Sequence, residues 1–198
     1  GPNPDGITIA NERIYTADTD GMNWPSQSTR VSVVDINSFE FEKTITVSLN
    51  PNYIYSDSDG DVYVICMSDY SDDKSYIVQR IDAKTDEVKT VEGIKAYKMT
   101  VADDIAYIMF NDYYANEVKY YKYDLKNEKL LSDNFITDGT VVSSPNGIGV
   151  DPVTGDIYVG KSNKKNNGDV YVFSSEGKLK SQFETLPYPA DFVFMTNK

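Results

Sequence analysis

Histidine is absent from this sequence of 198 residues, and cysteine occurs once, at Cys66. Histidine is the commonest general base and the commonest transition-metal ligand, so its absence removes the usual acid–base and metal chemistry of hydrolases. Cys66 follows the apolar run 62–65 with no basic residue nearby, which predicts a small buried side chain and not a nucleophile. Any catalytic chemistry would therefore have to come from carboxylates.

Positive charge is also scarce. Lysine and arginine total 19 against 31 aspartates and glutamates, for a formal net charge of -12. Because nucleic-acid binding requires a stripe of lysine and arginine that releases counterions, this balance excludes a nucleic-acid partner. The cluster Lys161–Lys165 lies in an Asn-rich stretch, which predicts a solvated loop tip.

Long apolar runs and helical patterns are missing as well. No stretch approaches the length of a membrane span, and no signal peptide is recognisable. Short runs of valine, isoleucine, threonine and tyrosine alternate with polar residues instead, and turn residues separate them about every ten positions. The sequence therefore predicts an all-β protein.

One pattern of three landmarks recurs along the chain. The first landmark is a Pro-x-x-hydrophobic motif, here called the Pro motif, at 4–7, 51–54, 145–148 and 189–192, with a degenerate copy at 96–99. The second is a hydrophobic-Tyr strand at Tyr15, Tyr63, Tyr107 and Tyr158, with spacings of 48, 44 and 51 residues. The third is a small acceptor that ends an apolar alternation, at Asp35, Asp82, Asp124 and Ser174. A long period of this kind is typical of repeat architectures.

Each repeat contains four short strands, which predicts a β-propeller with one four-stranded blade per repeat and the innermost strand first. The expected blades are 4–47, 48–93, 94–137 and 138–186, and an additional inner strand, Phe192–Met195, lies in a closing segment, 189–198. That strand has no blade of its own to complete. We therefore expect the chain to be the C-terminal part of a larger ring of seven or eight blades, closed by N-terminal blades or by self-association; a self-contained ring of four blades is the alternative.

Antiparallel strands place alternate connections at the same end of a blade, so the Pro motifs and the longest connections should share one face. These connections are expected at 18–29, 68–75, 111–117 and 161–168. We predict that any ligand binds on this long-loop face, because exposed aromatic rings and amides are suited to recognition. The candidate ligand-binding residues are Trp24, Tyr70, Tyr113, Tyr114, Asn52 and Asn146.

Two acidic segments raise the question of a metal. Asp57–Asp61 alternates carboxylates, but its glycine stands fourth and no glutamate closes the loop, so it is interpreted as a hairpin turn and not as a calcium loop. Asp18 and Asp20 lie in a long connection on the expected ligand face and are the better metal candidates. The sequence otherwise indicates neither metal nor cofactor.

At the segment 145–152 and its continuation 155–159, the chain resembles the YVTN-type propeller repeats of bacterial cell-surface and surface-layer-like proteins, which are common in the Bacteroidetes. The resemblance covers essentially the whole chain. It implies a secreted, periplasmic or outer-membrane surface protein, lipid-anchored in some members, that has no enzymatic activity. It implies little about the ligand, because the repeat specifies a fold and not a site.

The expected function is thus recognition or scaffolding, with a protein or a glycan as partner. The alternative is a metal-dependent hydrolase, because Asn146-Gly147 and Asp18 look similar to motifs of gluconolactonase-like propellers, in which such residues help to hold a divalent metal. Lys161 stands where that family has an acid. A streptogramin-lyase-like activity would need a histidine, which this chain lacks.

Overall fold

The computed structural model describes residues 1–69, 75–112 and 117–195. The chain divides into two compact units, Gly1–Tyr97 and Lys98–Lys198, and each is described by itself. Both units consist of antiparallel sheets, and the one helical element in the described residues is the single 3-10 turn η1 (Gly21–Asn23). None of the described helical segments has the length and hydropathy that crossing a membrane requires.

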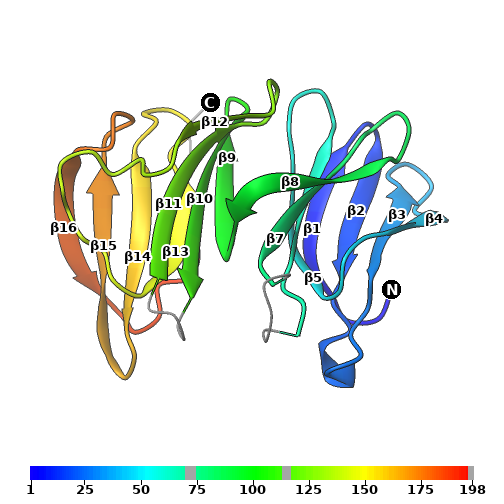
Figure 1. Ribbon diagram of the computed structural model, residues 1–198, viewed down its shortest axis with the longest axis horizontal. Coiled ribbons are helices and arrows are strands. Elements are labelled where there is room, and N and C mark those ends of the chain that lie inside the picture. The colour runs from blue at the N-terminus through cyan, green and yellow to red at the C-terminus, as the bar shows by residue number, and fades with distance from the viewer. Residues whose placement is uncertain (70–74, 113–116, 196–198) are drawn as a thin grey trace. The chain divides into compact units, whose positions relative to one another are not determined.

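The first unit contains two four-stranded sheets (Figure 1). Blade 1 consists of β1 (Pro4–Ala10), β2 (Arg13–Asp18), β3 (Arg30–Asp35) and β4 (Phe41–Thr46). Blade 2 consists of β5 (Pro51–Ser56), β6 (Val62–Cys66), β7 (Ile77–Ile81) and β8 (Val88–Lys95). In both sheets the strands are paired in sequence order, as expected for a meander that starts with its inner strand.

The second unit repeats this arrangement. Blade 3 consists of β9 (Lys98–Ala102), β10 (Ile105–Asp112), β11 (Glu117–Asp124) and β12 (Lys129–Ser132). Blade 4 consists of β13 (Pro145–Val150), β14 (Ile157–Asn163), β15 (Asn166–Phe173) and β16 (Leu179–Thr185). The predicted four strands per repeat and the all-β class are confirmed by these four sheets.

Blades 1 and 2 share one apolar core. The alternation along each strand sends one set of side chains from blade 1 toward blade 2, and a matching set returns from blade 2. The buried cluster comprises Ala10, Tyr15, Ala17, Val31, Val33, Ile45 and Val47 from the first repeat, and Ile54, Val62, Val64, Cys66 and Ile81 from the second. Neither blade buries this surface alone, so the packing of one blade on the next stabilises both.

Glycine in the Pro motif allows the closest approach between neighbouring blades. A Cβ at Gly6 would lie 2.5 Å from the carbonyl oxygen of Asn52 in the next Pro motif. In the second unit, a Cβ at Gly147 would lie at the same distance from the carbonyl oxygen of Ala190. Because this contact recurs, residues 189–192 pack against blade 4 in the same way as β5 packs against blade 1.

A side-chain hydrogen bond also joins successive Pro motifs to the preceding blade. Thr19 donates its hydroxyl to the carbonyl oxygen of Pro51 over 2.7 Å, and the Asn111 amide donates to that of Pro145 over 3.2 Å. Thr19 and Asn111 each lie four positions after the landmark tyrosine of their repeat. These bonds hold the Pro motifs beside the long connections, as predicted from strand alternation.

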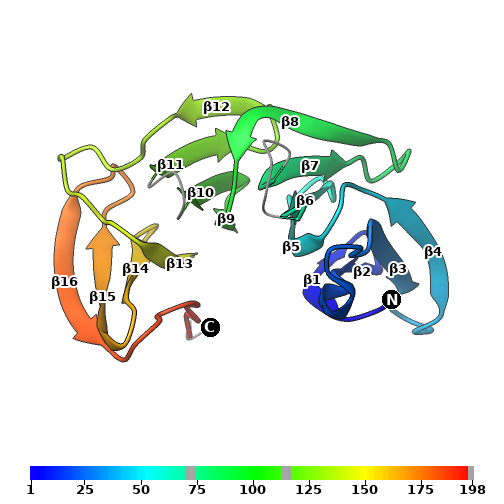
Figure 2. The same cartoon turned by 60° about the horizontal axis from the view of Figure 1, so that its bottom comes forward.

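The segment after β16 returns toward the β13 edge of blade 4 (Figure 2). Phe192 and Phe194 pack on Tyr158, with ring centroids 5.8 and 5.1 Å apart. Residues 191–195 nevertheless form no strand, so the expected strand Phe192–Met195 is absent from the described part of the chain. The reason is physical: an inner strand pairs with the second strand of its own blade, and all sixteen described strands already pair within blades 1 to 4.

Two other expectations about local structure were wrong. The stretch 161–168 is not a long loop, because β14 and β15 extend through it and leave a two-residue turn, with Lys164 at a φ of 59°. The alternating Lys161–Asp169 and Asn163–Asn166 pairs continue the ladder. The sequence pattern predicts the last strand of blade 3 over 129–135, but this strand ends at Ser132, because Phe135 turns inward and packs against Tyr107 and Tyr120.

The acceptor landmark closes the turn after each third strand. Asp35 accepts backbone N–H groups of Asn37 and Ser38 over 2.9 and 2.7 Å. Asp82 accepts those of Lys84 and Thr85 in the same way, each over 2.9 Å. These bonds favour the ionised carboxylate and hold the pKa of both side chains below the ordinary value.

Gly6→Ala should destabilise the first unit, because the new methyl group meets a backbone carbonyl that cannot rotate away. We expect a loss of about 1–3 kcal/mol in unfolding free energy, the usual range for an overpacked contact. Gly21→Ala is the control, since its Cβ would meet nothing closer than 3.4 Å. Urea denaturation of the two variants and the wild type gives the comparison; equal midpoints for all three would contradict the close blade contact.

Acid should weaken the fold through the turn carboxylates. A pKa below the unfolded value contributes stability that is present above the ordinary aspartate pKa of about 3.9 and is lost as the pH falls through the folded value. We therefore expect the stability advantage of the wild type over Asp82→Asn to shrink between pH 7 and pH 3. Denaturation at both pH values measures it, and an advantage independent of pH would show that the turn does not favour the ionised form.

Candidate functional site

The longest fully described connection within a blade joins β2 to β3 and stands beside the start of β1. Several hydrogen bonds fix its backbone, among them Asp20 N–H to the Pro2 carbonyl over 3.1 Å, Asn23 N–H to the Asp20 carbonyl over 3.0 Å, and Ser28 N–H to the Thr19 carbonyl over 3.2 Å. The Asn23 amide also donates to the Asp20 carboxylate over 2.8 Å. The loop therefore has a defined backbone conformation that includes its own turn.

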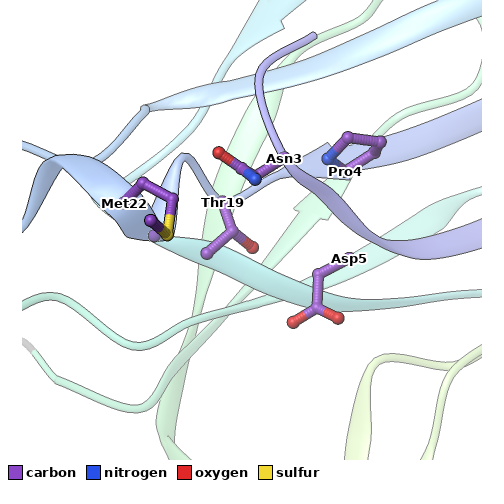
Figure 3. A pocket seen from close by; sticks show the side chains of 6 residues that line it. Asn3, Pro4, Asp5, Thr19 and Met22 are labelled. Carbon is purple, nitrogen blue, oxygen red and sulfur yellow. The ribbon is translucent and has the colours of Figure 1, made fainter.

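A pocket of 280 Å³ lies between this loop and the first Pro motif (Figure 3). Its lining combines amide, carboxylate, hydroxyl and thioether groups with the ring of a proline, and the residues are Asn3, Pro4, Asp5, Thr19, Gly21 and Met22. The Thr19 hydroxyl already donates to Pro51, so the side chains of Asn3 and Asp5 supply the polar groups for a ligand. The pocket lies on the end of blade 1 at which the long-loop face was predicted.

Two large apolar side chains of the same loop face solvent. Met22 is 86 % exposed and Trp24 is 64 % exposed. Met22 lines the pocket directly, while Trp24 stands two residues further along, just after η1. Trp24, which was chosen from the sequence as a candidate ligand-binding residue, is thus exposed. The sequence analysis did not select the pocket residues Met22, Asn3 and Thr19. For Thr19 a signal was available, because it lies four residues after the landmark Tyr15.

The other sequence-predicted ligand residues do not gather at this pocket within the described structure. Asn52 lies half-buried in β5, where its backbone carbonyl faces Gly6. Asn146 lies half-buried in β13 and donates its amide to the Pro189 carbonyl over 3.4 Å. Both residues therefore take part in the contact between a blade and the next Pro motif, Asn52 through its backbone carbonyl and Asn146 through its side-chain amide. Tyr70, Tyr113 and Tyr114 lie outside the described residues.

Asp18, the first metal candidate, is completely buried at the end of β2. One carboxylate oxygen accepts the Thr16 hydroxyl over 3.1 Å, and the other accepts the Ser32 hydroxyl over 2.6 Å. The Arg30 guanidinium lies 3.9 Å from the second oxygen. A carboxylate with these donors joins β2 to β3 and has no open side toward a divalent cation.

Asp20 and the turn 57–61 serve as local structure in the same way. Asp20 has a φ of 51° and holds Asn23, as described above. In the turn, Asp57 accepts the Asp61 N–H over 2.9 Å and Gly60 has a φ of 88°, so the turn interpretation is confirmed. Among the described residues no group of three or more acidic, cysteine or histidine side chains converges as a metal site would require.

Cys66 offers no nucleophile. It is buried in β6, and burial raises the pKa of its thiol to about 12, so the thiolate is not formed near neutral pH. Its sulfur lies 3.8 Å from Oε1 of Gln79. The sequence-based prediction of a small buried side chain is confirmed.

Lys98 is a buried charge that the sequence did not reveal. It opens β9 at the degenerate Pro motif, and its Nζ donates to the Ala190 carbonyl over 2.8 Å and to the Asp191 carboxylate over 2.5 Å. The lysine is 5 % exposed, whereas the Asp191 side chain is largely exposed. This contact holds the segment 189–192 against β9 within the second unit. No sequence motif predicts it.

Comparison with solved structures assigns the fold. The Dos1 propeller is similar with a TM-score of 0.66 at 12% identity, over 95% of this chain and 48% of that chain. A gluconolactonase from Xanthomonas campestris gives 0.60 at 12% identity, over 96% and 65%. Hydrazine synthase from Kuenenia stuttgartiensis gives 0.63 at 14% identity, over 87% and 51%. This chain therefore has a β-propeller fold.

These similarities show the fold alone, because the identities are low and the neighbours include enzymes of unrelated chemistry. The chain spans about half the length of the Dos1 propeller and hydrazine synthase chains. No family model matches the sequence, and no curated protein matches it. The resemblance to YVTN-type repeats thus stays a prediction.

Asp18→Ala should destabilise the first unit without changing any response to metals. The substitution leaves the buried Ser32 hydroxyl without its acceptor, which costs about 1–3 kcal/mol. Asp20→Ala, which removes only an exposed hydrogen bond, should stay within about 0.5 kcal/mol of the wild type. Melting curves with and without calcium or manganese provide the test. A metal-induced rise of Tm in the wild type that Asp18→Ala abolishes would restore Asp18 as a ligand.

Proposed function

We propose that this chain is a recognition module of a cell-surface or periplasmic propeller protein, which binds a protein or glycan ligand through the β2–β3 loop without catalysis. The observation that carries the proposal is the exposure of Met22 and Trp24 on a hydrogen-bonded loop beside the 280 Å³ pocket. A ligand seated there meets the apolar side chain of Met22 and the polar groups of Asn3 and Asp5.

The energetics support a ligand at this loop. An aromatic side chain contributes a contact surface on the order of 150–250 Å² at low entropic cost, and tryptophan is enriched among the residues that dominate binding. The hydrogen bonds of Asp20, Asn23 and Ser28 hold the loop in place, so the loop loses little conformational entropy when a ligand binds. The loop therefore presents a preorganised apolar surface that is exposed to water in the free protein.

The chemistry of the remaining candidates supports binding over catalysis. Asp18 is enclosed by hydroxyl donors, Asn146 contacts Pro189, and the Cys66 thiol is buried and protonated. None of these three groups combines exposure with the activation that a nucleophile, base or metal ligand needs. The hydrolase alternative is therefore less well supported than recognition.

The surface location rests on the resemblance to cell-surface propeller repeats. The net charge of -12 adds a constraint on the partner, because a strongly acidic protein repels acidic ligands and favours neutral or basic ones. Neutral oligosaccharides and neutral or basic peptides are thus the ligand classes to test first.

Trp24→Ala should reduce binding to neutral glycans or peptides at least tenfold without unfolding the chain, because truncation of a central aromatic contact typically costs 2 kcal/mol or more. Phe41→Ala is the matched control: Phe41 is 63 % exposed and starts β4, at the other end of blade 1 from the β2–β3 loop. Glycan and peptide arrays identify the ligand, and titration of wild type and variants gives the affinities.

Trp24 is the only tryptophan, so its fluorescence reports directly on the loop. A ligand found on either array should shift the emission of the wild type and of Phe41→Ala in the same way. Binding that leaves Trp24 emission unchanged, or that survives Trp24→Ala, would place the ligand elsewhere and reject the proposal. Response on one array but not the other decides between glycan and peptide.

A further inference from the structure

One face of blade 1 carries a row of apolar side chains that blade 2 does not cover. Cross-strand neighbours in an antiparallel sheet share a face. The pairs Ile9–Ile14, Ile14–Val34 and Val34–Phe41 therefore form one row across β1 to β4. Ile7, two positions before Ile9, lies on the same side of β1. We call these five residues the Ile7 face.

In the equivalent rows of two other blades, the residues on the second and third strands are buried. In blade 2 the row runs through Ser56, Val62, Ile81 and Val88, and Val62 and Ile81 belong to the core shared with blade 1. In blade 4 it runs through Val150, Ile157, Phe173 and Leu179. This blade packs on blade 3 through contacts between β13 and β9. The row is therefore a standard contact surface between blades.

On blade 1 the same surface is open. Ile7 and Ile9 are 65 % and 58 % exposed, whereas Ile54 and Ile148, which correspond to Ile7 in blades 2 and 4, are each 4 % exposed. Phe41 at the outer end of the row is exposed as well. A contiguous apolar row of this kind is uncommon on a solitary soluble domain and marks an interaction surface.

The C-terminal segment shows what such a surface fits. Residues 189–194 repeat the Pro motif of β1, so Phe192 and Phe194 correspond to Ile7 and Ile9. Both phenylalanines pack on Tyr158, and a Cβ at Gly149 would lie 2.7 Å from the Cβ of Phe192. Blade 4 thus offers a glycine- and tyrosine-lined surface that accepts these two positions of a following Pro motif.

We propose that the Ile7 face docks on a second copy of this chain, against the blade 4 surface that residues 189–194 cover in the single chain. Each copy contains both halves of the contact: among the described residues, the Ile7 face is exposed, and the matching surface of blade 4 is contacted by Phe192 and Phe194. Two copies also supply about the length of the Dos1 propeller and hydrazine synthase chains, of which one copy spans 48% and 51%. The contact is head-to-tail, because two different surfaces meet.

Two consequences follow from this arrangement. The segment 189–194 and β1 of the other copy compete for blade 4, so removal of the segment strengthens association. Both copies carry a net charge of -12, so their repulsion weakens association at low ionic strength and salt relieves it.

Light scattering coupled to size-exclusion chromatography tests the proposal. The mass of the wild type should rise with concentration from 22.2 kDa toward at least twice that value. The rise should be steeper in 0.5 M than in 0.02 M salt, because the electrostatic screening length falls from about 20 Å to about 4 Å. Deletion of residues 187–198 should lower the concentration at half-association at least tenfold. Ile7→Lys with Ile9→Lys should hold the chain at its monomer mass in both backgrounds, which is 22.2 kDa for the full chain and correspondingly less for the deletion variant.

Val153→Lys is the matched control, because Val153 is exposed to a similar degree but lies in the turn after β13. It should associate as the wild type does. A wild type and a deletion variant that both remain at their monomer masses would overturn the proposal. An association unaffected by the Ile7 and Ile9 substitutions would overturn it as well.

A disulfide trap identifies the two surfaces independently of mass. Ile7→Cys in one chain, mixed with Gly149→Cys in a chain lacking residues 187–198, should give a cross-linked pair under mild oxidation. The native Cys66 does not interfere, because it is buried and its thiol stays protonated. Val153→Cys in place of Ile7→Cys should give no cross-link, and equal trapping by both would show that the contact is not specific.

Discussion

The contact between one blade and the Pro motif of the next is the constraint on which the structure depends. Each sheet buries one face only when another blade lies on it, and Gly6 and Gly147 allow the backbone of the following motif to approach. Thr19 and Asn111 then bind the proline carbonyl of that motif. Stability in a repeat protein of this kind is a sum over neighbouring repeats, so a blade without a neighbour is the weak point.

The same contact positions the candidate binding site. Thr19 is held by Pro51, and Asp20 is held by Pro2, so the β2–β3 loop starts from two fixed points beside the first Pro motif. The loop can then display Met22 and Trp24 without disturbing the core. In repeat folds, a rigid scaffold commonly holds the loops that bind ligands.

Much of the fold could be predicted from the sequence, because its signals are local and recur in each repeat. These signals are the landmark tyrosines, the turn acceptors such as Asp82 and the alternating pattern of the strands. The hairpin at Lys164 escaped prediction because its polar strands have no apolar alternation. Lys98 escaped because its partner lies more than ninety positions away. At the candidate site, Trp24 was chosen from its place in a long connection, whereas Met22 joins the pocket only through the turn η1.

The most direct measurement of the central claim is whether blades 1 and 2 unfold together. Trp24 fluorescence follows blade 1, and amide hydrogen exchange of β6 follows blade 2 across the same urea series. A core shared between Tyr15, Val33 and Val62 predicts one cooperative transition with a common midpoint for both probes. Loss of blade 1 at a lower urea concentration, with β6 still protected, would contradict the dependence of each blade on its neighbour.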